Sequence, residues 1–187
     1  MGTRHLIIVY LHGQYRVAQY GQWDGYPEGA GVECLRFLRD EMDEIQFKGN
    51  LIRTKWIDDK KLEFMLDKFN GYVPPEFHRD TGVQILRMIQ NDEILTNRLY
   101  NDIEFAADSV FCEWAWVIDF DRKTFEAYKG FNGLELTNKD RFYFLRNHES
   151  KDSEYHGVKL VYEWRFNDLP TDEQFLKILN YEDSESE

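Results

Sequence analysis

The segment at residues 19–31, QYGQWDGYPEGAG, combines three aromatic side chains, an aspartate and four glycines. Trp23 and Tyr26 can form the walls of a pocket, and the carboxylate of Asp24 can orient a ligand between them. Long loops that carry aromatic and polar groups often bind ligands, because the surrounding scaffold positions them. We therefore expect a binding site here. Its expected residues in this segment are Tyr20, Gln22, Trp23, Asp24, Gly25 and Tyr26.

The same segment also has a purely structural interpretation. Gly25 and Pro27 would form a stiff turn, while Gly29 and Gly31 would let the next helix start close to the sheet. The beginning of that helix, near Gly31, would also offer backbone N–H groups to an anion. Neither of the phosphate-binding patterns G-x-x-x-x-G-K-[ST] and G-x-G-x-x-G occurs in the chain. Ligand binding and a structural role are therefore both open at this point.

Three charged residues outside this segment could complete the site. Glu113 lies on a mostly apolar strand, and a buried carboxylate needs a partner, which Arg4 or Arg16 could provide. Arg79 could pair with Glu113 or with Asp24 in space. We therefore add Arg4, Arg79 and Glu113 to the expected ligand-binding residues. A structural ion pair at Glu113 is the competing interpretation.

Patterns typical of catalysis or metal binding are missing from the sequence. Cys34 and Cys112 form no C-x-x-C pair, and the five histidines do not have the spacing of metal ligands. Asp119 and Asp121 form a D-x-D pair, but turn-initiating aspartates explain both. We expect Cys112 to pack as a small apolar side chain. The expectation is therefore no metal and no cofactor, and we assign no catalytic residue.

The chain of 187 residues is acidic, with 35 Asp and Glu against 23 Lys and Arg and a net charge of −12. This charge repels nucleic-acid phosphates and anionic lipid headgroups, so we expect neither nucleic acid nor a membrane as a partner. The apolar run His5 to Leu11 is too short for a signal peptide or a membrane span. We expect a cytoplasmic protein that binds a small molecule or a peptide, with a protein partner as a further option.

Apolar periodicity predicts both strands and helices. Residues 3–11 are β-branched and aliphatic with little helical period, which predicts a buried strand. Further strands are expected at 14–20, 110–119, 124–129 and 158–166. Helical spacing follows the glycine-rich loop and recurs near 59–69, 83–89 and 172–179. Residues 47–57 fit either a helix or a strand. The expected helix N-caps are Asp58, Asp80 or Thr81, and Thr171.

This order of elements predicts an α+β domain at residues 1–181, with antiparallel sheets built from hairpins and helices packed outside. A layered αββα sandwich, in which two sheets stack, is the alternative arrangement. Residues 182–187 are expected to form an acidic, flexible tail.

Several fragments resemble a family of small, largely uncharacterised proteins from microbes, fungi and phages, whose chains begin with GTR or CTR. The fragments are GTRHLI (2–7), VAQYGQWDGYPEG (17–29), HRDTG (78–82), FCEWAWVIDFD (111–121) and FEAYKGFN (125–132). The resemblance implies no established activity. The element order is also similar to that of N-terminal nucleophile hydrolases, which attack with the first residue of the mature chain. Here Gly2 has no nucleophile, and Thr3 would serve only after removal of two residues.

Three functional hypotheses follow. The first is a non-catalytic protein that binds a small molecule or a peptide at the 19–31 loop. The second is an amide or peptide hydrolase of the N-terminal nucleophile type, for which the intact mass would show a mature chain beginning at Thr3. The third is an acidic protein that binds a partner, such as a phage product or a decoy, whose complex would weaken as ionic strength rises.

Overall fold

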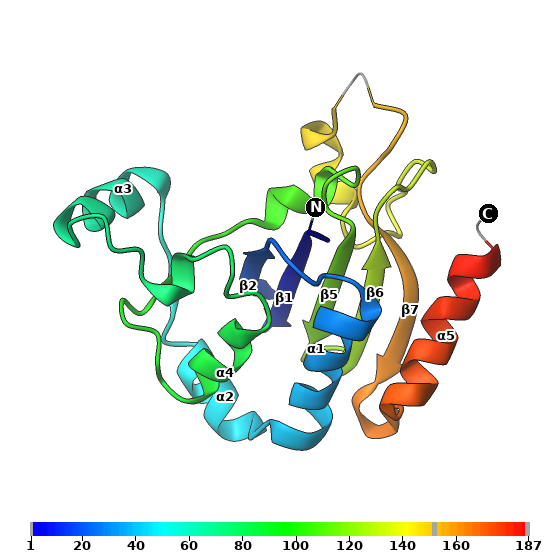
Figure 1. Ribbon diagram of the computed structural model, residues 1–187, viewed down its shortest axis with the longest axis horizontal. Helices are drawn as coiled ribbons and strands as arrows, with labels where there is room; N and C mark the ends of the chain where they lie inside the picture. Colours follow the sequence, from blue (N-terminus) through cyan, green and yellow to red (C-terminus); the bar gives the residue numbers. More distant parts are fainter. Residues whose placement is uncertain (1, 151–152, 186–187) are drawn as a thin grey trace.

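A five-stranded sheet lies at the centre of the molecule (Figure 1). The computed structural model describes residues 2–150 and 153–185. In spatial order the strands are β2 (Gln14–Gly21), β1 (His5–Leu11), β5 (Trp114–Asp119), β6 (Thr124–Lys129) and β7 (Lys159–Arg165). Neighbouring strands are antiparallel except for β1 and β5, which are parallel. The α+β prediction is confirmed, with this one parallel pair as the difference from the expected hairpins.

Local sequence explains where the first strands turn and where β5 begins. His12 and Gly13 both have positive φ angles, of 54° and 72°, which suits the tight turn between β1 and β2. The strand expected at 110–119 starts only at Trp114. Before it, the backbone N–H groups of Phe111 and Cys112 donate to the Asp108 carbonyl and form a turn.

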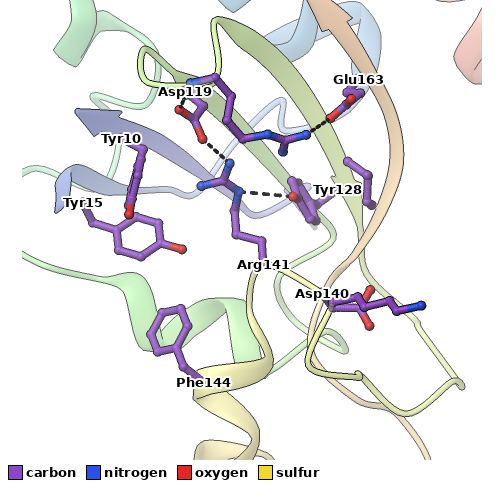
Figure 2. Close-up of a pocket in the computed structure, with 11 residues that line it drawn as sticks. Tyr10, Tyr15, Asp119, Tyr128, Asp140, Arg141, Phe144 and Glu163 are labelled. Carbon is purple, nitrogen blue, oxygen red and sulfur yellow. Dashed lines mark hydrogen bonds and ion pairs between the residues drawn. The ribbon is translucent and has the colours of Figure 1, made fainter. Parts of the chain in front are cut away.

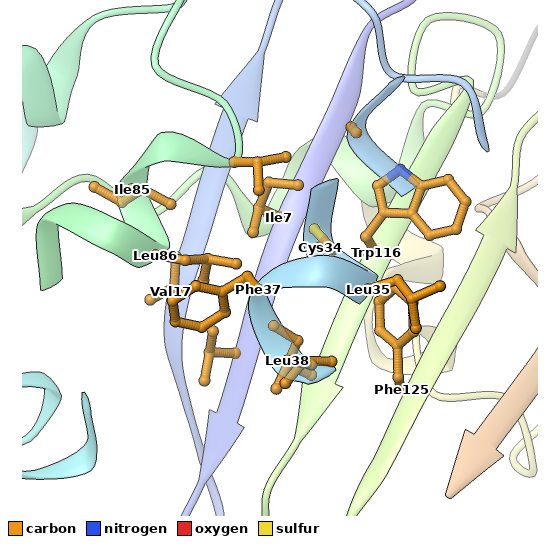
Figure 3. Packing of buried hydrophobic residues seen from close by; sticks show 14 of the residues in the cluster. Ile7, Val17, Cys34, Leu35, Phe37, Leu38, Ile85, Leu86, Trp116 and Phe125 are labelled. Carbon is orange, nitrogen blue, oxygen red and sulfur yellow. The ribbon is translucent and has the colours of Figure 1, made fainter. Parts of the chain in front are cut away.

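Helices cover one face of the sheet, where the larger core lies. This face is covered by a helical segment made of three short pieces, η1 (Pro27–Gly31), α1 (Val32–Arg36) and η2 (Phe37–Glu41), and by α2 (Glu44–Leu51), α4 (Gln84–Gln90) and α5 (Asp172–Glu185). Phe37 packs there with Trp116 and Phe125 of the sheet in a single apolar cluster (Figure 3). All three side chains are fully buried, and each such burial stabilises the fold by roughly 1.5–3 kcal/mol.

Short helical turns cover the opposite face of the sheet. The turns η4 (Ile103–Ala107) and η5 (Tyr143–His148) pack there against Ile8 and Val117. The central strands are thus buried on both faces without a stacked second sheet. The other strands of the described chain, β3 (Lys55–Trp56) and β4 (Arg98–Leu99), form a separate two-residue pair. The αββα alternative is therefore not what the described residues form.

Two of the expected helix N-caps are confirmed, and the third is wrong. Asp58 accepts the Lys61 N–H at 3.0 Å, and Thr171 and Gln174 exchange two hydrogen bonds at 3.0 and 3.3 Å as a capping box. Helix α4, in contrast, begins at Gln84 with no side-chain cap. Neither Asp80 nor Thr81 caps it. The Asp80 carboxylate accepts the Trp23 indole N–H, and the Thr81 hydroxyl donates to the Pro75 carbonyl.

Helix α3 (Asp59–Lys68) lies away from the sheet and buries none of its side chains (Figure 1). The turn η3 (Pro75–Phe77) follows α3 in the chain and precedes α4. The ambiguous segment 47–57 contains both the end of α2 and strand β3. Helix α5, which follows the short turn η6 (Phe166–Asp168), extends into the segment where we expected a tail; residues 186 and 187 lie outside the described residues. None of the described helices has the length and apolar character to cross a membrane.

Candidate functional site

The 19–31 loop is held against the sheet by its backbone. The Gly25 N–H donates to the Thr3 carbonyl at 2.9 Å, and the Gly25 carbonyl accepts the Trp116 indole N–H at 3.0 Å. A Cβ atom at Gly25 would lie 2.7 Å from the His5 Cβ and 2.8 Å from the Thr3 oxygen, so only glycine fits there. The positive φ of the turn, 54°, belongs to Asp24 and not to Gly25.

The loop leaves its large aromatic side chains at the surface. Trp23 is 49% exposed and Tyr26 is 39% exposed. The Tyr26 hydroxyl donates to Asp24 Oδ1 at 3.2 Å, so this bond uses one of the two carboxylate oxygens. The loop therefore presents one indole, one phenol and two carboxylates, those of Asp24 and Glu28, to solvent.

The expected anion site at the start of the helix is not formed. The N–H groups of Gly29 and Gly31 donate to the Tyr26 carbonyl, and the N–H of Ala30 donates to the Asp24 carbonyl. These short-range bonds use the donors that an anion would need. The structural part of the interpretation holds at Gly31, where a Cβ atom would lie 2.7 Å from the Trp116 ring.

A hollow of about 480 Å³ lies between this loop and the start of α4. We call it the loop hollow. The side chains that matter most in its lining are His5, Trp23, Asp24, Glu33, Asp80 and Arg87. The Trp23 side chain lines the loop hollow, and its indole Nε1–H donates to Asp80 Oδ1 at 2.8 Å. This contact explains why Asp80 is not available as a helix cap.

His5 forms part of the wall of the loop hollow and is only 2% exposed. Burial lowers its pKa to about 4, against smaller opposing effects of the Thr3 carbonyl and the Asp24 charge. The imidazole is therefore neutral near pH 7. Neither ring nitrogen has a partner of hydrogen-bonding geometry among the described residues. Such unpaired buried polar atoms are uncommon in proteins and call for a functional explanation.

The charges around the loop hollow are mainly negative. Arg87 is already paired, with Glu33 at 3.0 Å and with Glu41 at 2.7 Å. Among the described residues, Asp24 and Asp80 have no comparable ion pair with an arginine or lysine, and the contact from Arg79 Nε to Asp80 is 3.9 Å. The hollow therefore favours hydrogen-bond donors and positive charge over anions.

The structure brings together only some of the residues expected at the site. Trp23 and Asp24 line the loop hollow, with Gly25 beneath them. Tyr20 and Arg79 line a different hollow. Gln22 contacts residues of that second hollow, because its side chain accepts the Tyr20 hydroxyl at 2.6 Å and its N–H donates to the Arg79 carbonyl at 3.0 Å. Arg79 pairs weakly with Asp80 and not with Glu113.

Arg4 and Glu113 lie next to one another at the start of β1 and β5. The Glu113 carboxylate accepts the backbone N–H of Arg4 at 3.3 Å, and the Glu113 N–H donates to the Arg4 carbonyl at 3.1 Å. The Arg4 guanidinium instead lies over the Phe111 ring, 4.5 Å from its centre. The expected pairing therefore involves the main chain of Arg4. Neither residue lines the loop hollow.

A buried charge network that the sequence did not reveal lies on the other face of the sheet (Figure 2). Asp119 at the end of β5 and Glu126 on β6 are 1% and 0% exposed. Arg141 bridges them, with Nη2 at 2.5 Å from Asp119 and 2.8 Å from Glu126. Arg122 pairs with Glu126 at 3.1 Å and with Glu163 of β7 at 2.9 Å. Two guanidinium groups thus face three carboxylates, and each carboxylate has at least one cationic partner.

The network lies beneath a cavity of about 550 Å³, whose aromatic lining includes Tyr10, Tyr15, Tyr128 and Phe144 (Figure 2). Burial raises the pKa of Tyr15, and burial together with the Glu126 charge raises that of Tyr128. These phenols therefore act as hydrogen-bonding groups and not as bases at neutral pH. Because the buried charges are paired with each other, the network is explained by the fold itself.

The aspartates of the D-x-D pair have turn roles, as expected. Asp119 Oδ1 accepts the N–H groups of Asp121 and Arg122, both at 2.9 Å. Asp121 accepts the N–H groups of His12 and Gly13 at 2.8 and 2.7 Å, which ties the two hairpin turns together. What the pattern could not show was the second role of Asp119 as a partner of Arg141.

Both cysteine thiols are fully buried, and burial raises their pKa. Cys34 packs in the larger core and Cys112 in the smaller one, which agrees with the expected packing role. In the part of the chain that the structure describes, no three His, Cys, Asp or Glu side chains are grouped as metal ligands would be.

No protein-family model matches the chain, and searches of curated proteins and of solved structures also find no significant match.

Proposed function

We propose that the protein binds a small molecule or a short peptide in the loop hollow, and that the bound group combines a flat apolar part with a hydrogen-bond donor or a positive charge. The observation that carries this proposal is His5, a neutral and enclosed imidazole in the wall of the hollow, neither of whose ring nitrogens has a hydrogen bond of good geometry. A ligand that pairs with it would relieve the cost of leaving a buried polar group unsatisfied.

Two further features support this ligand chemistry. The half-exposed indole of Trp23 is held in one orientation by Asp80, so it offers a fixed surface on which a flat group can stack. The Asp24 carboxylate beside it has one oxygen that is not used by Tyr26. A cationic group would be attracted to this carboxylate and to the aromatic face.

The experiment uses two probes that differ only in the sign of their charge. Tryptamine carries a flat indole ring and an ammonium group, whereas 3-indolepropionate carries the same ring and a carboxylate. We expect tryptamine to give saturable heat in titration calorimetry and to raise the melting temperature, and 3-indolepropionate to do neither.

Variants connect binding to the loop hollow. We expect Trp23→Ala and Asp24→Asn to weaken tryptamine binding at least tenfold; asparagine is chosen because it tolerates the positive φ at this position. Trp56→Ala, which removes a partly exposed indole on β3, is the matched control and should bind normally. The proposal is wrong if the wild-type protein binds neither the amine nor a Lys-Trp-Lys peptide, or if loss of Trp23 leaves binding unchanged.

A further inference from the structure

Glu76 is a buried carboxylate with one unpaired oxygen. It lies in turn η3 and is 0% exposed. Its Oε1 atom accepts both the N–H and the hydroxyl of Thr96 at 2.8 Å. Its Oε2 atom has no hydrogen-bond partner anywhere in the described chain. An ionised carboxylate in such a place needs a partner, because desolvating a charge without one is costly.

Glu76 lines a hollow of about 250 Å³, which we call the side hollow. A second carboxyl group, that of Asp102, lines it too and accepts the Tyr20 N–H at 3.1 Å. Burial raises the pKa of Asp102 to about 6, so its negative charge is also poorly compensated. Within residues 2–150 and 153–185, neither carboxylate forms a salt bridge.

The other walls of the side hollow are aromatic and aliphatic. Tyr20, Phe77 and Tyr100 contribute rings, and Leu62 contributes an alkyl surface. Aromatic faces attract organic cations, and an alkyl chain is stabilised by apolar contact. Arg79 also lines the hollow, but its side chain is 65% exposed, and its nearest charged contact is Asp80.

We propose that the side hollow binds the ammonium or guanidinium end of an alkyl chain, with Glu76 and Asp102 as its two carboxylate partners. Two carboxylates and a cationic head group give a neutral to slightly negative site, and the rings enclose the chain. A hard divalent cation fits less well, because Ca²⁺ takes about six to eight oxygen ligands. The side hollow shares no lining residue with the loop hollow, so this proposal is independent of the function proposed above.

The test compares n-butylguanidinium and n-butylammonium with butylurea, which has a similar shape and no charge. We expect calorimetry on the full chain at low ionic strength to show saturable binding of the two cations and none of butylurea. Glu76→Gln should weaken cation binding at least tenfold while its amide oxygen keeps the bonds to Thr96. Asp102→Asn provides a second variant, with the same expected direction.

Two more variants separate this site from its alternatives. Arg79→Gln should tighten cation binding severalfold, because it removes a like charge from the rim. Trp23→Ala should leave binding unchanged, since Trp23 belongs to the loop hollow. Comparing the affinities for free butylguanidinium and for N-acetyl-arginine-N-methylamide then tells whether the site prefers a free small-molecule cation or the basic side chain of a peptide.

The proposal is overturned by any of three results. These are equal binding of butylurea and the cations, unchanged binding in both Glu76→Gln and Asp102→Asn, and displacement of the cations by equimolar Ca²⁺ or Mg²⁺. Circular dichroism and the melting temperature of each variant check that the fold is retained.

Discussion

At the scale of single residues, the imidazole of His5 is tightly enclosed by its neighbours in the wall of the loop hollow. Three glycines enclose its ring: a Cβ atom would lie 2.2 Å from it at Gly21, 2.9 Å at Gly25 and 3.3 Å at Gly82. Glycine at these three positions thus leaves the space that the imidazole occupies. This close packing keeps water away from the ring and holds its pKa near 4.

We predict that His5 makes the free energy of unfolding rise with pH between about 4 and 6.5. In this window the unfolded chain holds a proton on His5 that the folded chain does not, so higher pH favours folding by up to about 3 kcal/mol. Urea unfolding of the wild type and of His5→Gln at a series of pH values measures the difference. Parallel stability profiles of the two proteins would contradict this prediction.

Asp102 gives the control for this measurement, because it acts with the opposite sign. Its pKa is raised from 3.8 to about 6, so its contribution to stability is lost as pH rises through that interval. The Asp102→Asn variant should therefore show a steeper increase of stability with pH than the wild type.

At the scale of secondary-structure elements, Arg141 joins the end of β5 and the interior of β6 to the segment before η5. It contacts Asp119 on β5 and Glu126 on β6 with short, charge-assisted hydrogen bonds. Tyr128 adds a hydroxyl to the same Glu126 carboxylate at 2.7 Å. The elements on this face of the sheet are therefore held together by charges as well as by apolar contact.

We predict that Arg141→Met lowers the free energy of unfolding by about 3–5 kcal/mol, because it leaves two buried carboxylates without their shared partner. Lys139→Met is the matched control, since it removes an exposed cation from the rim of the same cavity, and it should change stability by less than about 0.5 kcal/mol. Chemical denaturation of both variants measures this. Equal effects of the two substitutions would show that the network contributes little.

Features that depend on residues nearby in the chain could be predicted from the sequence, whereas features that depend on distant residues could not. Asp58 and Thr171 were identified as caps because their partners lie three residues away in the chain. Asp80 was misassigned because its partner, the Trp23 indole, is far away in sequence. The strand positions followed from alternation, but the parallel pairing of β1 with β5 could not be read from either strand alone.

The candidate site was predictable only in part, for the same reason. The aromatic loop pointed to Trp23 and Asp24, which do line one hollow. His5 was missed, although a histidine in an otherwise apolar strand was a visible signal. Glu76 and Arg141 act through partners on other elements, and nothing in their neighbouring residues indicated this.

For the molecule as a whole, the degree of burial differs strongly between its parts. Helix α3 has ten residues and no buried side chain, whereas the seven-residue α4 buries Ile85, Leu86, Met88 and Ile89. Phe64 and Tyr72, in and after α3, are 62% and 55% exposed. Stability against local opening follows tertiary contact more than helix length.

We predict that the backbone amides of α3 exchange with deuterium at least a hundredfold faster than those of α4 and of β1. Hydrogen exchange followed by mass spectrometry at neutral pH measures the rates of all three segments in one experiment. If α3 were protected as well as α4, the helix would have to be covered by contacts other than those described.

The parallel pairing of β1 with β5 also has a consequence for biosynthesis. His5 pairs with Trp114, so β1 has no partner on this edge until β5, much later in the sequence, has also been made. During this delay an apolar strand is open to wrong partners, as is usual when a fold depends on contacts distant in sequence. Nascent chains stalled before Trp114 should therefore associate with chaperones, and chains stalled well beyond Lys129 should be released from them.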